Sequence, residues 1–434
     1  MKSHGHLLRV LGVGFGLAVI IGNTIGAGIF RAPGAIAEQL PAPAPFLLVW
    51  IAGGVYALLG AICVAELGTM IPRSGGQYVF SRYALGEYAG FIVGWSDWIS
   101  SCGSTAAVAL VVGTFSGALI PALEGKATAT AATVTIVFAL LQWRGIVWGS
   151  TTQNITSLLK ALAFLALIAA AFVFGGAGSL TTQTFSATPV TLTAVIVSLQ
   201  AAIYTYDGWA GVIYFSEEVQ QPGRNIPRAL FGGVLTVTAI YLLVNVALLY
   251  VLPVTRIAGQ EFAAGEAATV IFGAYGDTIF RCLTIASMLS GINALHLMAT
   301  RVVFAMSRDG LFTRKAAFVN KGGTPSVSLF LSALVALMFI MLGQRFELVI
   351  TVLAFFFVAN YILSFISLFV LRRREPETPR PYRAWGYPVT PALALAGSLL
   401  FLAGAIWADT RNSVYALLLL GVSYPVFRLL KRFS

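Results

Sequence analysis

The sequence predicts an all-α, polytopic membrane protein. Of its 434 residues, 58% are hydrophobic and only 10% are charged, whereas a soluble protein carries charge on about a quarter of its residues. Apolar stretches of roughly 20 residues, the length that crosses a bilayer, recur along the whole chain. The polar connections between them are too short to form a soluble domain with its own core. We therefore expect the lipid bilayer to surround most of this protein.

Twelve apolar stretches are long enough to be transmembrane helices. The eighth is unusually long and is expected to include helix outside the membrane. The longest polar connections are 307–325 and 372–390, and the second, charged and rich in proline, is expected to lie at the lipid headgroups. The expected spans are about 8–32, 45–70, 88–120, 128–147, 150–175, 191–216, 228–252, 267–306, 326–342, 347–371, 391–408 and 412–430.

The distribution of positive charge orients the chain in the membrane. The net charge of +11 could indicate a nucleic-acid partner, but the cationic residues gather on alternate connections, which argues against one. The rich set is Lys2, Arg9, Arg73, Arg82, Arg144, Arg224, Arg228, Arg308, Arg314, Lys315, Lys321, Arg372, Arg373, Arg374, Arg380, Arg383, Arg428, Lys431 and Arg432. The poor set is Lys126, Arg256, Arg345 and Arg411. By the positive-inside rule the rich set is cytoplasmic, so we expect a multi-pass protein of the cell membrane with both termini in the cytoplasm.

The residue patterns of enzymes are missing from the sequence. We find no Walker A motif, no metal-ligand cluster and no nucleophile elbow. Cys63, Cys102 and Cys282 lie in apolar stretches and imply neither a disulfide framework nor a zinc site. We therefore expect no enzymatic activity, no cofactor and no metal. A nutrient sensor built on the same helices is a distant alternative, because it would need a soluble extension that neither terminus has room for.

The first apolar stretch carries an expected break in its helix. Residues 20–30 read IIGNTIGAGIF and place Gly22, Gly26 and Gly28 within seven residues. Irregular backbone within a membrane survives only where it is buried or lines a wet cavity. The positive end of one half-helix would meet the negative end of the other, which suits a zwitterion. The stretch also lacks a small-residue cleavage site, so we expect it to be retained rather than removed as a signal peptide.

The sixth apolar stretch carries a second expected break. Residues 204–211 read YTYDGWAG, so an acid, two glycines and three aromatic residues interrupt an apolar helix. Interrupted helices at corresponding places in two halves are the best sequence indication of a transporter's binding site. Glu217 and Glu218 follow this span and are expected to act in a gate or scaffold, with Arg224 or Arg228 as partners.

Four stretches resemble the amino acid–polyamine–organocation (APC) superfamily of permeases, above all the L-type amino acid transporter branch and its bacterial relatives. They are 21–30 (IGNTIGAGIF), Glu66 with 72–78 (PRSGGQY), 206–209 (YDGW) with 217–229 (EEVQQPGRNIPRA), and Arg301 with 305–310 (AMSRDG). The resemblance implies a LeuT-like fold of two inverted five-helix repeats and two extra helices. The first repeat would span 1–175 with its break near 24–28, and the second 191–371 with its break near 205–211. The last two helices and the C-terminus would occupy 391–434.

The resemblance also implies a substrate site between the two breaks. Amides at Gly26, Ala27 and Gly28, together with Thr24, would bind a substrate carboxylate. Carbonyls of Tyr204, Thr205 and Asp207 would bind its ammonium group, and the Tyr204 ring would cover it. For the glycines the alternative is close helix packing. For Tyr204 the alternative is ordinary packing. The charge of Asp207 is costly within a span, and its alternative role is to cap a half-helix that begins near Trp209.

Lys160 is the one lysine inside an expected span. In sodium-independent relatives a lysine at this position takes the place of a sodium ion and joins the first helix to the eighth. By that resemblance it would contact the carbonyl near Gly22 and either Ser287 or Ser290. The alternative is that the lysine reaches along the span to the cytoplasmic interface.

Together these patterns predict a sodium-independent secondary transporter of amino acids that works by alternating access. Exchange and proton-coupled uptake both stay open, since the family uses similar residues for each. Small residues at the breaks favour neutral L-amino acids, and Asp207 leaves room for cationic ones. The sequence carries no signal for or against an accessory subunit.

Overall fold

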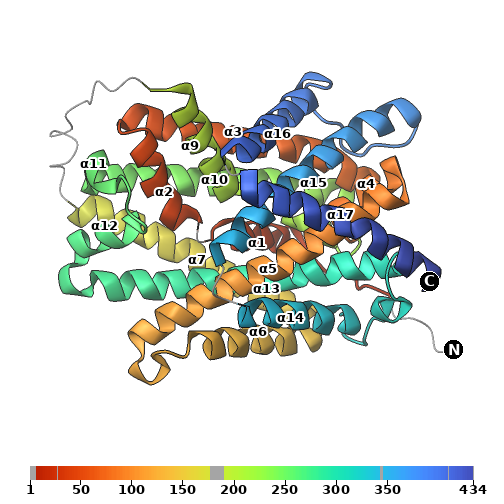
Figure 1. Cartoon of the computed structure of the whole chain (residues 1–434), viewed down its shortest axis with the longest axis horizontal. Coiled ribbons are helices and arrows are strands. Elements are labelled where there is room, and N and C mark those ends of the chain that lie inside the picture. The colour runs from red at the N-terminus through yellow and green to blue at the C-terminus, as the bar shows by residue number, and fades with distance from the viewer. Residues whose placement is uncertain (1–5, 27, 176–189, 343–345, 409, 434) are drawn as a thin grey trace.

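The computed structural model describes residues 6–26, 28–175, 190–342, 346–408 and 410–433. These residues form helices and two isolated bridges but no strand (Figure 1). In chain order the α-helices are α1 (Val13–Thr24), α2 (Gly28–Gln39), α3 (Pro43–Met70), α4 (Gln77–Leu85), α5 (Glu87–Leu119), α6 (Ala127–Trp143), α7 (Ile146–Phe174), α9 (Leu192–Tyr206), α10 (Pro222–Val251), α11 (Val254–Ile257), α12 (Ala263–Phe272), α13 (Gly276–Arg308), α14 (Ser326–Met341), α15 (Phe346–Arg374), α16 (Val389–Ala408) and α17 (Thr410–Phe433). Short 3-10 helices are η1 (Pro121–Leu123), η2 (Gly211–Phe215), η3 (Gly273–Tyr275) and η4 (Arg314–Ala317).

The long helices agree with a membrane protein. In the described part of the chain, eight helices are long and apolar enough to cross a bilayer, or nine if α1 and α2 count as one bent span. Helices α6 and α14 are apolar but shorter, and α9 has 15 residues before its break. The all-α, multi-pass prediction is thereby confirmed, while the count of twelve spans stays a prediction.

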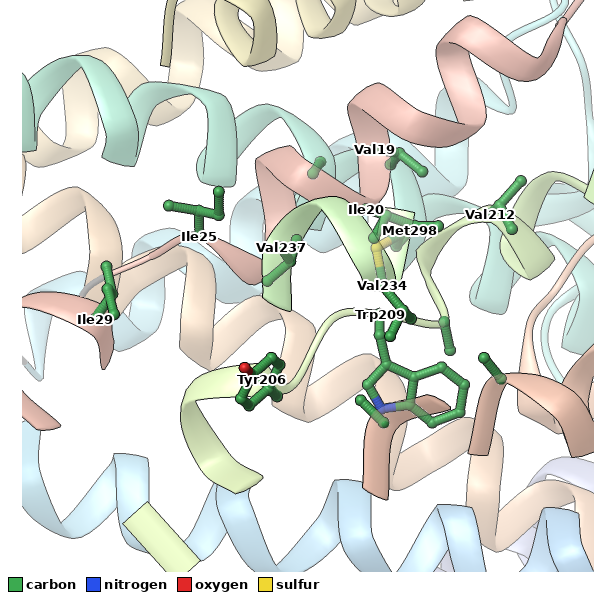
Figure 2. Packing of buried hydrophobic residues seen from close by; sticks show 14 of the residues in the cluster. Val19, Ile20, Ile25, Ile29, Tyr206, Trp209, Val212, Val234, Val237 and Met298 are labelled. Carbon is green, nitrogen blue, oxygen red and sulfur yellow. The ribbon is translucent and has the colours of Figure 1, made fainter. Parts of the chain in front are cut away.

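Helix α1 lies in the middle of the bundle. It packs against α7, α10 and α13, and α13 in turn runs beside α5 (Figure 1). A helix that is apolar on all sides is stable only when it is surrounded. Val19 and Ile20 of α1 are accordingly fully buried, and Figure 2 shows them with Val212, Val234 and Met298 from three other elements. The first break therefore lies at the core of the protein.

Arginine side chains of several connections meet at one end of the bundle, which we call the arginine-rich end. Asp309 accepts contacts from Arg73 at 2.9 Å and Arg82 at 3.3 Å, and so joins α13 to the segment around α4. These connections belong to the set expected in the cytoplasm. Their clustering agrees with the predicted orientation.

The proline-rich connection between α15 and α16 places an arginine against α3. Its Arg380 is almost fully buried and pairs with Glu66 of α3 at 3.0 Å, and Arg372 pairs with the same carboxylate at 2.6 Å. A buried acid needs such partners because it cannot be solvated. The expectation that the rest of this segment lies at the lipid headgroups stays a prediction.

The partners expected for two acids after the second break are also wrong. Glu218 pairs with Arg301 of α13 at 2.9 Å, with both side chains fully buried, and Glu217 pairs with Arg308 at 2.6 Å. Arg224 and Arg228 of α10 lie nearer in sequence, but η2 packs against α13 as well as against α1 and α10. The acids consequently tie the second break to α13 rather than to the helix that follows.

Candidate functional site

The first apolar span is interrupted where the glycines predict. Helix α1 ends at Thr24, where the Ile25 N–H donates to the Ile21 carbonyl at 3.1 Å. Helix α2 begins at Gly28, and the two helices are bent by 48°. Ala27, one of the predicted site residues, lies outside the described residues. The gap between Thr24 and Gly28 is called the first break below.

Lys160 of α7 reaches the C-terminal end of α1. Its ammonium donates to the carbonyls of Gly22 at 2.9 Å and Ile25 at 2.6 Å. The side chain is 1% exposed, so it does not extend to an interface. The negative end of a helix is a favourable place for a cation, and here the Gly22 carbonyl belongs to the last turn of α1 and Ile25 directly follows it. The predicted contact with Gly22 is present, and Ile25 is an additional partner.

The two serines expected beside Lys160 take different roles. The Ser287 hydroxyl donates to the Ile25 carbonyl at 3.1 Å, so Ser287 and Lys160 hold the same acceptor. Ser290 lies 2.9 Å from the Ser157 hydroxyl and accepts from the Gln153 amide at 3.2 Å. Of the two, Ser287 touches the end of the first break, and Ser290 joins α13 to α7 one turn away.

The second break follows α9. That helix ends at Tyr206, and Gly208 has a φ of +107°, a backbone conformation that favours glycine. The chain resumes only as the short 3-10 helix η2. The segment between Tyr206 and Gly211 is called the second break below. The predicted interruption is present, but the expected half-helix from Trp209 is replaced by η2.

Glycines bring the two breaks into contact. A Cβ atom on Gly208 would lie 2.9 Å from the Thr24 backbone nitrogen, and one on Gly28 would lie 3.1 Å from the Thr205 Cα. A side chain at Gly208 would clash with backbone, and one at Gly28 would fit only if Thr205 moved by a few tenths of an ångström. Figure 2 shows the surrounding apolar residues, with Ile25 and Ile29 on the first break and Tyr206 and Trp209 on the second.

Tyr241 of α10 joins the two breaks through one hydroxyl group. Its oxygen lies 2.7 Å from the Thr24 carbonyl and 3.0 Å from the Thr205 carbonyl. Because a hydroxyl has one proton, it donates to one of these carbonyls at a time. The sequence analysis missed this residue, although a tyrosine in the apolar stretch 228–252 was a visible signal.

Two of the three carbonyls expected to bind an ammonium group already accept hydrogen bonds. The Thr205 carbonyl faces Tyr241, and the Tyr204 carbonyl accepts from the Asp207 N–H at 3.1 Å. The Thr24 hydroxyl is different, because it is buried and has no partner among the described residues. At the first break, a substrate would therefore find a ready hydroxyl as well as backbone groups.

The Asp207 carboxylate is held by a tyrosine and does not cap η2. The Tyr361 hydroxyl of α15 donates to it at 2.6 Å. The residue before η2 is Ala210, which offers no side-chain cap. Trp209 stacks on the Tyr361 ring at 4.9 Å and helps to fix it. The capping alternative for Asp207 is thus not what the structure shows.

A cavity of about 810 Å³ lies over both breaks and is called the main cavity below. Arg31 and Glu261 form an ion pair at 2.5 Å in its wall, and their exposed side chains, 37% and 65%, mark its mouth. The structure brings six of the predicted substrate residues to its wall, namely Thr24, Gly26, Gly28, Tyr204, Thr205 and Asp207. Tyr204 stands there with its ring 6.0 Å from that of Phe357. Lys160 and the serines lie behind the first break rather than in this wall.

No metal centre accompanies the cavity. Across the ranges that the structure describes, no group of three or more His, Cys, Asp or Glu side chains is placed to hold a metal ion. The polar groups in the wall are instead hydroxyls, backbone groups, the Asn23 amide, the Arg31–Glu261 ion pair and the Asp207 carboxylate, which suit hydrogen bonding to a small polar molecule.

Comparison with known proteins gives consistent similarities. The family model described as "amino acid permease" matches residues 16–423. The serine/threonine exchanger SteT of Bacillus subtilis (strain 168) is 30% identical over 434 residues, covering 98% of each chain. The human b(0,+)-type amino acid transporter 1 is 29% identical over 430 residues, covering 95% of this chain and 86% of the relative. The mouse large neutral amino acids transporter small subunit 2 is 28% identical over 441 residues, covering 97% and 81%.

Proposed function

The chain belongs to the amino acid permease family, and we propose that it is a sodium-independent secondary transporter of amino acids that works by alternating access. The observation that carries the proposal is the contact of two interrupted helices at the wall of one cavity. Opposed half-helix ends are a recurring way to bind a charged substrate within a membrane.

The polarity of the helix ends suggests how an amino acid binds. Helix α2 begins at Gly28 and directs its positive end at the main cavity, so this end would take the substrate carboxylate. Helix α9 ends at Tyr206 with its negative end, which would take the ammonium group. The Thr24 hydroxyl would add a hydrogen bond, and Tyr204 would cover the bound molecule.

Lys160 supports transport without sodium. Its ammonium already donates to the carbonyls of Gly22 and Ile25 at the end of α1. A sodium ion at that place would therefore be repelled by a positive charge. The same side chain ties α7 to the first break, and Ser287 ties α13 to it. A change in these contacts would allow α1 to move relative to α7 and α13.

The structure resembles one end state of an alternating-access cycle. At the arginine-rich end, Leu11 and the residues after η2 exchange two backbone hydrogen bonds, Leu11 N–H to Glu218 at 2.9 Å and Gln220 N–H to Leu11 at 2.8 Å. The buried Glu218–Arg301 pair lies beside them. The main cavity instead has its mouth at Arg31 and Glu261. With the arginine-rich end in the cytoplasm, this would be an outward-facing state.

The proposed architecture assigns the helices to two halves of inverted topology in the cell membrane. The halves are 1–175 and 191–371, each with its first helix broken, and 391–434 adds two peripheral helices. Both termini would be cytoplasmic. The substrates we propose are neutral L-amino acids, in keeping with relatives named for serine and threonine or for large neutral amino acids.

Counterflow in proteoliposomes tests this function. Purified protein is loaded with one unlabelled amino acid, and uptake of a labelled panel is measured in sodium and in choline, with and without a proton gradient. We expect uptake of neutral amino acids that depends on the internal amino acid and is equal in the two salts. Uptake that requires sodium would overturn the assignment of Lys160. Uptake that needs no internal amino acid but follows the proton gradient would favour the alternative, a proton-coupled symporter.

A further inference from the structure

Four exposed arginines at the arginine-rich end form a surface that we call the basic face. Arg224 and Arg228 lie in the first turns of α10, Arg373 lies in the last turn of α15, and Arg383 lies in the connection from α15 to α16. None of the four side chains makes a hydrogen bond or an ion pair with the residues that the structure describes. The acids that follow η2 pair with α13 instead, so they leave the arginines of α10 free.

Packing of the connection against α10 brings the basic face together. Pro381 lies against α10 at Gly223, where an added Cβ atom would be 2.9 Å from the proline Cβ. The ring of Tyr382 lies 5.6 Å from that of Phe231, further along the same helix. Arg383 follows directly in the chain, so it lies beside the first turns of α10, which carry the other arginines.

Glu66 of α3 fixes the other side of the basic face. One oxygen of its carboxylate accepts from the Arg372 guanidinium and from the Ala384 N–H, at 2.6 Å each. Arg373 directly follows the first of these partners, and Arg383 directly precedes the second. The same buried acid therefore places the backbone at both arginines.

Acids of the connection do little to offset this positive charge. The connection carries Glu375 and Glu377, and the first already pairs with Arg374 at 3.3 Å. Glu377 is then left against four arginines. Basic clusters next to a transmembrane helix attract anionic lipids, and the attraction grows with each arginine near the surface.

The surroundings of the basic face indicate that its partner is a lipid headgroup. Trp385 is 77% exposed and Val389, the first residue of α16, is 62% exposed. Tryptophan is enriched where a membrane meets water, because its ring is apolar and its N–H is polar. The apolar helices α10, α15 and α16 begin or end close to the four arginines. Lipid phosphates lie at this depth of a bilayer.

We propose that the basic face binds the headgroups of anionic lipids and so joins α10 to the connection between α15 and α16. A guanidinium group can bind a phosphate through two parallel hydrogen bonds, which gives geometric specificity as well as charge attraction. A bound lipid would hold α10, which packs against α1, to a segment that Glu66 fixes on α3. This inference goes beyond the proposed function, because binding requires only the folded protein and lipid.

Thermal unfolding of the purified full chain in detergent tests the proposal. The unfolding temperature is measured while phosphatidylglycerol is added, and again with phosphatidylcholine of the same acyl chains. We expect phosphatidylglycerol to stabilise the wild type much more than phosphatidylcholine does. For Arg224→Gln/Arg228→Gln and for Arg373→Gln/Arg383→Gln, the concentration that gives half of this effect should rise on the order of twentyfold, since each arginine contributes a factor of about five.

A matched control removes two cations from another side of the same end. Lys315 and Lys321 are exposed and lie in the connection before α14, whose Gly322 carbonyl accepts from the Ile146 N–H of α7. Lys315→Gln/Lys321→Gln should respond to phosphatidylglycerol as the wild type does. Inorganic phosphate at the same concentrations should not stabilise the wild type.

Four results would overturn the proposal. The two lipids could stabilise the wild type equally, the arginine variants could respond as the wild type does, or the lysine variant could lose as much as they do. Equal stabilisation by inorganic phosphate would show a site for a free anion instead of a lipid. The measurement involves no transport, so each of these results leaves the proposed transport function untouched.

Discussion

The two helix breaks are alike in sequence but are stabilised by different chemistry. At the first break, the carbonyls of Gly22 and Ile25 are held by the Lys160 ammonium, a full positive charge supplied by another helix. At the second break, the Asp207 carboxylate is held by a neutral hydroxyl of Tyr361. The first break is therefore electrostatically complete without any ligand. The second keeps an uncompensated negative charge beside the main cavity.

This difference separates rigidity from specificity. Charge compensation at the first break fixes the end of α1, so the amides that follow it can be held ready for a carboxylate common to all amino acids. The carboxylate of the second break can respond to the part of the substrate that varies. Four substitutions test this division of roles, from the largest expected effect to the smallest.

Gly28→Val should abolish uptake. A Cβ at this position would lie 3.1 Å from the Thr205 Cα, and the larger valine side chain would push the two breaks apart. Gly26→Val is the more selective test, since a Cβ there makes only ordinary contacts with backbone oxygens, at 3.9 Å and 4.0 Å. Loss of uptake in both variants, with normal amounts of folded protein in the membrane, supports the carboxylate site. Normal uptake by either folded variant would contradict the proposed carboxylate site.

Lys160→Ala should lower uptake by roughly a hundredfold while substrate binding persists. Two charge-assisted hydrogen bonds, each contributing on the order of 1.5–3 kcal/mol, are lost from the end of α1. Binding is measured by substrate-dependent thermal stabilisation, and uptake and exchange are measured in parallel. If only the pH dependence of uptake disappears and exchange stays intact, the lysine carries a coupled proton. A variant indistinguishable from wild type would contradict both roles.

Asp207→Asn should weaken cationic amino acids about tenfold more than neutral ones, because it removes the one carboxylate in the wall of the main cavity close to both breaks. Competition of unlabelled lysine and leucine against labelled alanine gives the ratio directly. An equal loss for both competitors would show that Asp207 serves the structure of the second break and not the substrate.

Tyr241→Phe should reduce uptake of all amino acids alike, by about fivefold, since one neutral hydrogen bond between the breaks is worth roughly 1 kcal/mol. Tyr206→Phe is the matched control. Its ring lies 4.9 Å from that of Tyr241, but its hydroxyl donates to the Trp50 carbonyl, away from the first break. A loss for Tyr206→Phe as large as that for Tyr241→Phe would show that ring packing, and not the bridge, is what matters.

Local patterns in the sequence predicted the breaks, and long-range contacts limited the rest. Glycine spacing identified both interruptions, because an interrupted helix within an apolar stretch depends on residues close together in the chain. Resemblance placed Lys160 against Gly22. Neither indicated Ile25 as a partner, since that contact depends on how α7 and α1 are rotated. Partners for Glu217 and Glu218 were misassigned for the same reason.

Asp97 could have been found from the sequence. It is an acid inside the apolar stretch 88–120, and the rule that singled out Asp207 applies to it equally. Its partner could not, because the Tyr214 hydroxyl of η2 reaches Asp97 of α5, at 2.8 Å, only in the folded bundle. Cavities between helices are properties of packing, and a single sequence does not encode them in any local pattern.

The two hydrogen bonds between Leu11 and the segment after η2 help to close the arginine-rich end, and they affect which residues there can change in evolution. Both bonds run between main-chain atoms, so they are made by any residue except proline at the donor positions. Side chains at these positions can change with new lipids, temperatures or substrates while the seal keeps its geometry. Substitutions in the neighbouring ion pairs, Glu218–Arg301 and Glu217–Arg308, can then change how readily this end opens.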